Sequence, residues 1–197
     1  MSLNARQWWA RCGSGLTVAA LLSACQPAAW TRVDPGAITV KPVAGQVVAP
    51  AGWIRYAAYA DGLILTRDGT PIQYIKVVKA AHETAFKSIG RKSSPDLLPN
   101  ELAELLIAAR KATPAMKTLA VKGNEPASFG DQDGVKLRFS YRDANGASFD
   151  QMVYASVTDS GVLLLEYQAL SRYFFARDLD VFEKLAASFK DRSARPP

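Results

Sequence analysis

The sequence has few of the residues that carry most nucleophilic and metal chemistry. Its 197 residues include two cysteines, Cys12 and Cys25, and one histidine, His82. A zinc site would need further His or Cys ligands, which the sequence does not supply, so we predict no metal site. Any Ser-His-Asp or Cys-His mechanism would depend on His82, and no Gly-x-Ser-x-Gly nucleophile motif accompanies it. We therefore interpret His82 as a surface or loop residue and predict no catalytic residues and no cofactor.

Long runs of one kind of residue are also absent. Lysine and arginine exceed the acidic residues by 24 to 18, for a formal net charge of +6, but they are scattered along the chain. A nucleic-acid site needs a basic face with aromatic residues that stack on bases, so we expect no nucleic-acid partner. The apolar stretch at residues 13–22 is too short to cross a bilayer as a helix, which needs about 20 apolar residues. The sequence has no phosphate-binding glycine loop and no internal repeat.

The short apolar stretch has the arrangement of an export signal. Arg6 and Arg11 precede it, and it ends in the small residues of Leu22-Ser23-Ala24-Cys25. A basic start, a short apolar centre and small residues at the end are typical of a cleaved signal peptide, here residues 1–24. The last four residues resemble the lipobox of bacterial lipoproteins at every position. That resemblance implies a lipid on the Cys25 sulfur, cleavage between Ala24 and Cys25, and acylation of the new amino terminus.

An alternative is an ordinary secretory signal that is cut after Ala24, with Cys25 incidental. Cysteine usage favours lipidation, because removal of residues 1–24 leaves Cys25 as the only cysteine, and an unpaired thiol is a liability in an oxidising compartment. We therefore expect the lipid bilayer to be one partner, contacted through acylated Cys25. Gram-negative lipoproteins retained in the inner membrane commonly carry Asp after the cysteine, so Gln26 favours the outer membrane, facing the periplasm.

Residues 25–36 are predicted to be the lipidated cysteine and a tether. Two or three acyl chains give stable anchoring, and a flexible stretch of this length reaches on the order of 15–20 Å. Within the tether, Trp30 either rests at the lipid interface, where indole rings are favoured, or caps the core of the domain.

Residues 37–191 predict one α+β domain, followed by a polar tail over residues 192–197. Branched apolar runs predict strands at 38–40, 46–49, 63–66 and 72–78, and Asp68-Gly69 between the last two predicts a hairpin. Residues 135–141 alternate between apolar and polar, which is typical of a half-buried antiparallel strand. In the strand that follows, one face carries Phe149, Gln151, Val153, Ala155 and Val157, and the other carries Met152 and Tyr154. The run at 162–165 is apolar on both faces and indicates a central strand. Residues 80–95 predict a loop.

Two segments have helical periodicity. The first begins near Pro99 or Asn100, with Asn100 as its candidate N-cap, and it is stopped by Pro114. The second carries an apolar stripe made up of Leu179, Phe182, Leu185, Ala186 and Phe189. We expect an antiparallel sheet of two meanders covered by these two main helices, because each apolar stripe needs a partner surface.

Three segments of the chain are similar to the PsbP-like fold, which is named for an extrinsic photosystem II subunit and is shared by various bacterial lipoproteins. They are Val47-Val48-Ala49-Pro50-Ala51-Gly52-Trp53, then Leu65-Thr66-Arg67-Asp68-Gly69 running into Ile72-Gln73-Tyr74-Ile75, and finally Tyr173-Phe174 before a helix that finishes Ala187-Ser188-Phe189. The resemblance covers about residues 37–190, and the long loop near 80–98 departs from it. The family has no shared catalytic residues, so the resemblance implies an assembly factor or scaffold.

Tyr173, Phe174 and Phe175 form the densest aromatic group. They either pack the start of the second helix into the core or form a partner-binding rim, where exposed aromatic residues act as anchors. Asp131-Gln132-Asp133-Gly134 has alternating carboxylates, but it lacks the distal Glu of a calcium loop, and turn chemistry accounts for it.

These observations favour a non-catalytic periplasmic lipoprotein that binds or assembles an envelope protein partner. The alternatives are a periplasmic hydrolase of envelope polymers that uses two carboxylates, and an immunity or inhibitor lipoprotein.

Overall fold

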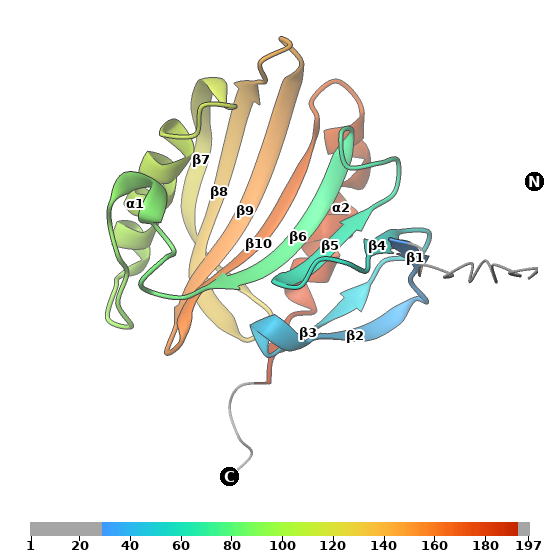
Figure 1. Cartoon of the computed structure of the whole chain (residues 1–197), viewed down its shortest axis with the longest axis horizontal. Coiled ribbons are helices and arrows are strands. Elements are labelled where there is room, and N and C mark those ends of the chain that lie inside the picture. The colour runs from blue at the N-terminus through green and yellow to red at the C-terminus, as the bar shows by residue number, and fades with distance from the viewer. Residues whose placement is uncertain (1–28, 193–197) are drawn as a thin grey trace, which may run out of the picture.

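The computed structural model describes residues 29–192, and their largest element is an eight-stranded antiparallel sheet with a helix on each face (Figure 1). The strand order of this sheet is β1-β4-β5-β6-β10-β9-β8-β7. Its strands are β1 (Trp30–Arg32), β4 (Ile54–Tyr56), β5 (Gly62–Thr66), β6 (Gln73–Ala80), β7 (Lys117–Phe129), β8 (Gln132–Arg142), β9 (Ser148–Thr158) and β10 (Gly161–Leu170). A separate sheet of order β11-β3-β2 contains β2 (Gly36–Val40), β3 (Gly45–Ala49) and β11 (Lys190–Asp191).

The α+β class is confirmed, and the sheet arrangement differs from the predicted pair of meanders. The meanders β4-β5-β6 and β7-β8-β9-β10 do exist, but they join through the antiparallel pair of β6 and β10 into one sheet. In that pair Lys76 lies opposite Glu166 and Tyr74 lies opposite Gln168. The predicted central strand is confirmed, because β10 lies between β6 and β9. The early strands β2 and β3 belong to the small sheet.

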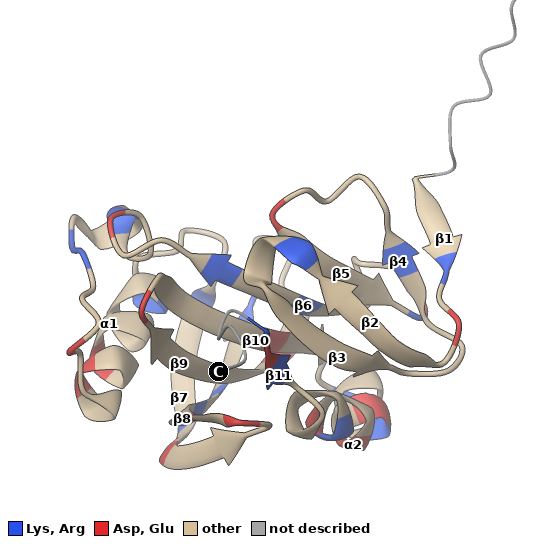
Figure 2. Ribbon diagram, turned by 90° about the horizontal axis from the view of Figure 1, so that it is seen from below, with Lys and Arg blue, Asp and Glu red and all other residues tan. Residues whose placement is uncertain are grey.

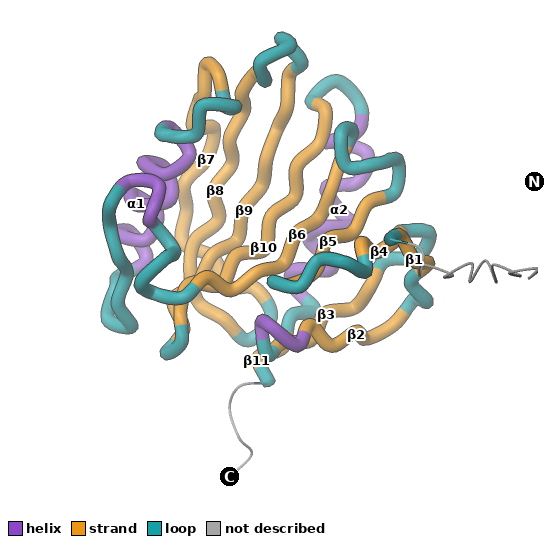
Figure 3. The backbone as a smooth tube through the Cα atoms, viewed as in Figure 1, coloured by secondary structure: helices purple, strands orange, loops and turns teal. Residues whose placement is uncertain are grey.

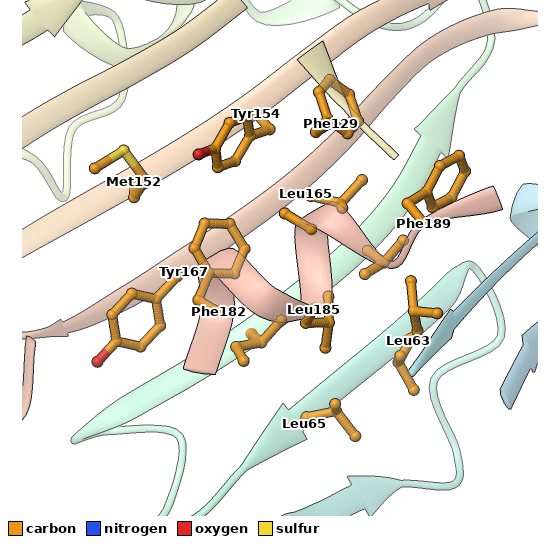
Figure 4. Close-up of a cluster of buried hydrophobic side chains, with 14 of the residues drawn as sticks. Leu63, Leu65, Phe129, Met152, Tyr154, Leu165, Tyr167, Phe182, Leu185 and Phe189 are labelled. Carbon is orange, nitrogen blue, oxygen red and sulfur yellow. The ribbon is translucent and has the colours of Figure 1, made fainter. Parts of the chain in front are cut away.

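The larger core lies between the sheet and α2 (Phe174–Ala187), as Figure 4 shows. Phe182 and Leu185 of the helix pack against Tyr154 and Tyr167 of the sheet. The predicted apolar stripe of this helix is therefore confirmed. Phe189 lies beyond the end of the helix, and its ring contacts Phe129 at the end of β7. Burial of a large apolar side chain contributes about 1.5–3 kcal/mol, so this cluster is the main source of stability.

The second core lies on the opposite face, under α1 (Pro99–Lys111). Leu102 and Leu106 of the helix pack with Leu137, Phe139 and neighbouring residues of β8 and β9. Figure 3 shows α1 beside β7 and β8, with the rest of this face left free of helices. The predicted loop before the helix contains a short 3-10 helix at Lys87–Ile89, and Phe86 at its start is buried in this core. A second 3-10 helix occupies Lys41–Val43.

The prediction that Asn100 caps the first helix was wrong. The helix begins at Pro99, so Asn100 lies inside its first turn. Glu101 supplies the cap instead, because its carboxylate accepts a hydrogen bond from the Leu98 N–H at 2.9 Å. Proline suits the first helical position, where no intrahelical partner is needed for an N–H.

The predicted tether is partly folded. Trp30–Arg32 pairs with β4, with Trp30 opposite Tyr56 and Arg32 opposite Ile54. The Ala57 N–H also donates to the Ala29 carbonyl at 2.8 Å. Gly36 is the first residue of β2. The chain is therefore held by the domain from Ala29 onward, seven residues earlier than the predicted end of the tether.

Candidate functional site

The predicted aromatic group divides where α2 begins. Phe175 is 2% exposed and its ring stacks on Tyr167 at 5.3 Å between centroids, so it belongs to the core. Tyr173 is 60% exposed and Phe174 is half-buried. Tyr173 and Phe174, with the hollow beside them, are called the aromatic rim below. The hollow is lined by Ala147, Ser148, Leu170, Ser171, Arg172 and the two rings.

Arg177 fixes the aromatic rim from the next turn of α2. Its guanidinium lies 5.4 Å from the Tyr173 ring centroid and 4.9 Å from that of Phe174. The two rings meet edge to face at 5.2 Å. The Tyr167 hydroxyl donates to the Phe174 carbonyl at 2.7 Å. These contacts hold an exposed aromatic side chain in a defined place, as is typical of an anchor for a protein partner.

Two carboxylates, Asp68 and Asp178, converge behind the aromatic rim. Gln73 Nε2 donates to Asp68 at 2.6 Å and to Asp178 at 2.9 Å, and Arg177 forms ion pairs with both. Arg67 Nη1 reaches Asp178 at 3.1 Å. Asp68 lies on the hairpin between β5 and β6 and Asp178 on α2, so no sequence pattern indicated that they meet. This set of five residues is called the Asp68–Asp178 cluster below.

The electrostatics of the Asp68–Asp178 cluster differ from those of a glycosidase pair. Burial raises the pKa of Asp68, but hydrogen bonds from Arg177 and Gln73 and the charges of Arg177 and Arg67 outweigh it and lower the pKa overall. The hydrogen bond to Asp178 is the main cause of a raised pKa for Arg177. A general acid needs a carboxyl whose pKa is raised. The cluster therefore favours a structural role in positioning Arg177 under the aromatic rim.

A second hollow, the polar groove, lies on the α1 face of the sheet, where β6 and β10 are not covered by a helix. It measures about 530 Å³, and its lining includes Tyr59, Lys76, Arg110 and Glu166. Arg110 forms an ion pair with Glu166, which is 5% exposed. The Arg110 Nε and both side-chain amide atoms of Gln151 are buried without a partner among the described residues.

Two tyrosines, Tyr74 and Tyr141, remain protonated at neutral pH. Burial raises the pKa of Tyr141 to about 12 and moves that of Tyr74 above its ordinary range. Tyr74 donates a hydrogen bond to Gln168 Oε1 at 3.1 Å. A general base must be poised near the working pH, so neither phenol suits that role. The polar groove is a second candidate binding surface, with one buried donor, Arg110 Nε, that lacks a partner among the described residues.

His82 holds a loop in place. Its Nε2 lies 3.0 Å from the Thr158 carbonyl, which only accepts, so Nε2 is a donor, and its Nδ1 lies 2.8 Å from the Ser93 hydroxyl. Both ring nitrogens are used within the fold, which ties the segment after β6 to the end of β9.

Asp131 lies in the turn between β7 and β8, and Asp133 is the second residue of β8. Asp131 accepts the Asp191 N–H at 2.9 Å, and Asp133 accepts from the Ser128 hydroxyl at 2.6 Å. Within residues 29–192 there is no group of three or more His, Cys, Asp or Glu residues able to hold a metal ion. Ala24 and Cys25, the predicted cleavage and lipidation sites, lie outside the described residues.

In the described part of the chain, neither helix combines the length and the apolar character that a membrane crossing requires.

Comparison with known proteins identifies a shared fold but does not identify a family. No family model matches the chain, and no curated protein matches it. Among solved structures, the chain is similar to the Ran-binding protein Mog1p of Saccharomyces cerevisiae, with 10% identity, a TM-score of 0.52, and coverage of 81% of this chain and 96% of that chain. At this identity the likeness shows a shared fold alone.

Two further structures are similar at lower scores. Cyanobacterial PsbP (CyanoP) from Synechocystis is 12% identical, with a TM-score of 0.46 and coverage of 92% of this chain and 98% of that chain. A protein from Bacteroides thetaiotaomicron is 9% identical, with a TM-score of 0.49 and coverage of 84% of this chain. The chain spans about half, 52%, of the length of that Bacteroides protein.

Proposed function

We propose that the protein is a membrane-anchored lipoprotein of the periplasm, with a PsbP-like domain that binds an envelope protein without catalysis. The observation that carries this proposal is the sequence Leu22-Ser23-Ala24-Cys25, which is followed after three residues by a folded domain. The lipidated residue would place that domain directly at a membrane. Gln26 supports the outer membrane as the site of attachment.

The aromatic rim is the proposed docking surface for the partner. Tyr173 is the most exposed of the large apolar side chains in residues 29–192, and Arg177 and the Asp68–Asp178 cluster hold it in position. Aromatic and arginine side chains dominate the binding energy of protein interfaces. The five side chains of the cluster form hydrogen bonds and ion pairs with one another, which favours a structural role in a binding surface over a catalytic role.

The anchoring part of the proposal is tested by replacing the lipidated residue. We expect the wild-type protein to partition into detergent and its mature amino terminus to be acylated Cys25 by mass spectrometry. Cys25→Ser should release the domain into the soluble fraction without lowering its melting temperature, because the first buried core residue in the described part of the sequence is Val40. An unmodified Cys25, or residues 1–24 still attached, would contradict the proposal.

The docking part is tested by site-specific photo-crosslinking in living cells. A photo-reactive residue at position 173 should capture one envelope protein, whereas the same residue at Val48, which is also exposed, should not. Tyr173→Ala should reduce capture from a reporter placed at the neighbouring Arg172 by at least about tenfold, the size expected of a hot-spot side chain. Equal capture from positions 173 and 48 would remove the rim from the proposal.

A further inference from the structure

The first strand carries a pair of aromatic rings at the edge of the large sheet. Trp30 of β1 lies opposite Tyr56 of β4, and their ring centroids are 4.9 Å apart. Both side chains are half-buried, so part of each ring faces outward. Figures 1 and 2 show β1 and β4 side by side at one end of the molecule, with α1 at the other end.

The length of chain before this edge is short. The Ala57 N–H donates a hydrogen bond to the Ala29 carbonyl at 2.8 Å, so the chain is bound to the domain from residue 29 onward. Only four residue steps separate Ala29 from Cys25. A fully extended chain spans at most about 3.6 Å per residue, so Ala29 lies within about 14 Å of Cys25. If Cys25 is acylated, the β1–β4 edge is therefore held close to the bilayer.

The chemistry of the edge suits the headgroup layer. Trp and Tyr side chains are enriched at the membrane–water interface, because they combine an apolar ring with a polar group. Residues 29–34 and 54–61 contain two arginines, Arg32 and Arg55, and two aspartates, Asp34 and Asp61. Their charges cancel, so the attraction comes from the rings and does not require anionic lipid.

We propose that the Trp30–Tyr56 pair is a lipid-contact site, which rests on the headgroup layer of the membrane that holds Cys25. The inference rests on the proposed anchoring at Cys25. The domain then stands on its β1–β4 edge, and α1 and β7 point away from the membrane. The tether does not let the domain swing freely, because its folded end is itself part of the contact.

The fluorescence of Trp30 provides the test. The acylated protein is purified from membranes and reconstituted into phosphatidylcholine vesicles whose acyl chains carry bromine near the headgroups. After removal of residues 1–24 the chain retains two tryptophans, Trp30 and Trp53, and Trp53 is 2% exposed. We expect bromine to quench Trp30 by at least about half, since such quenching needs near contact. Trp30→Phe should abolish the quenched component and leave the emission of Trp53.

A matched reporter at the far end provides the control. In the Trp30→Phe background, Leu98→Trp places an indole at the start of α1, where Leu98 is 58% exposed. This reporter should not be quenched. Equal quenching at positions 30 and 98, or none at position 30 while mass spectrometry shows acylated Cys25, would overturn the lipid contact and leave the anchoring intact. An unmodified Cys25 would overturn both proposals.

Lipid charge separates this contact from simple electrostatic adsorption. Vesicles with one third phosphatidylglycerol should quench Trp30 to within about 20% of the value in pure phosphatidylcholine, because the edge has no net charge. The variant Arg32→Glu should behave like Arg142→Glu, which changes an exposed arginine on the distant strand β8. Quenching that appears only with anionic lipid would contradict contact through the aromatic pair.

Discussion

At the scale of single residues, the buried carboxylate of Asp178 should contribute strongly to the free energy of unfolding. Its side chain is 1% exposed and is held by Arg67, Gln73 and Arg177. Asp178→Ala would remove the acceptor of Arg67 and leave Gln73 and Arg177 with Asp68 alone, and the loss of a hydrogen bond to a charged group costs about 1.5–3 kcal/mol. We expect urea unfolding to show a loss of this size. Asp180→Ala, on the exposed side of the same helix, should change the free energy of unfolding by less than about 0.5 kcal/mol.

Asp68 makes the stability of the protein depend on pH. The pKa of Asp68 is lowered from its ordinary value of 3.8 in the folded protein, so its ionised form stabilises the fold. That stabilisation is present above about pH 4 and is lost as the pH falls through the lowered pKa. Asp68→Asn should therefore flatten the fall in the free energy of unfolding between pH 4 and pH 2.

The control for this titration is Asp96→Asn in the exposed loop before α1. It should retain the acid-dependent loss of the wild-type protein. If Asp68→Asn and Asp96→Asn give the same pH profile, Asp68 does not contribute to the dependence.

At the scale of elements, the turn between β7 and β8 depends on glycine. Gly130 has a φ of +61°, and a Cβ atom there would lie 1.9 Å from the Phe189 carbonyl oxygen. Gly146, in the turn between β8 and β9, has a φ of +82° with open space around it. Gly146→Ala should cost about 1 kcal/mol from the left-handed conformation alone, whereas Gly130→Ala should cost at least about 2 kcal/mol. Similar melting temperatures for both variants would contradict this.

The elements that the sequence predicts well have a strong periodic pattern. In β9, Val153 and Ala155 contribute to the core under α1, and Met152 and Tyr154 to the core under α2, as their alternation predicts. The Asp68-Gly69 turn also lies where predicted, with φ of +100° at Gly69. In these segments local pattern and tertiary structure agree.

The missed elements have no such pattern. β7 is exposed along most of its length, it contains Gly123 and Pro126, and its pairing with β8 shifts register twice. β1, β4 and β11 have two or three residues each and exist because a neighbouring strand pairs with them. The aromatic rim was visible as a cluster of rings, but only the geometry of α2 separates exposed Tyr173 from buried Phe175. The meeting of Asp68 with Asp178 depends on contacts across 110 residues.

At the scale of the whole molecule, the short tether should set the orientation of the domain. Insertion of 15 Gly/Ser residues between Pro27 and Ala28 adds a flexible segment with an r.m.s. length of about 20 Å. We expect the variant to remain in the membrane fraction, because Cys25 is unchanged, while bromolipid quenching of Trp30 falls by at least about half. Undiminished quenching would mean that the aromatic pair finds the membrane without help from the tether.

The early pairing of β1 also has a mechanical consequence. β1 is three residues long and lies at the edge of the sheet, and the main core includes none of its side chains. When a partner pulls the domain away from the membrane, the load passes from Cys25 to this strand first. Detachment of residues 29–32 would release about 11 Å of extended chain while the eight-residue and longer strands stay paired. The segment that contains β1 can therefore detach and extend under load while the core of the domain stays packed.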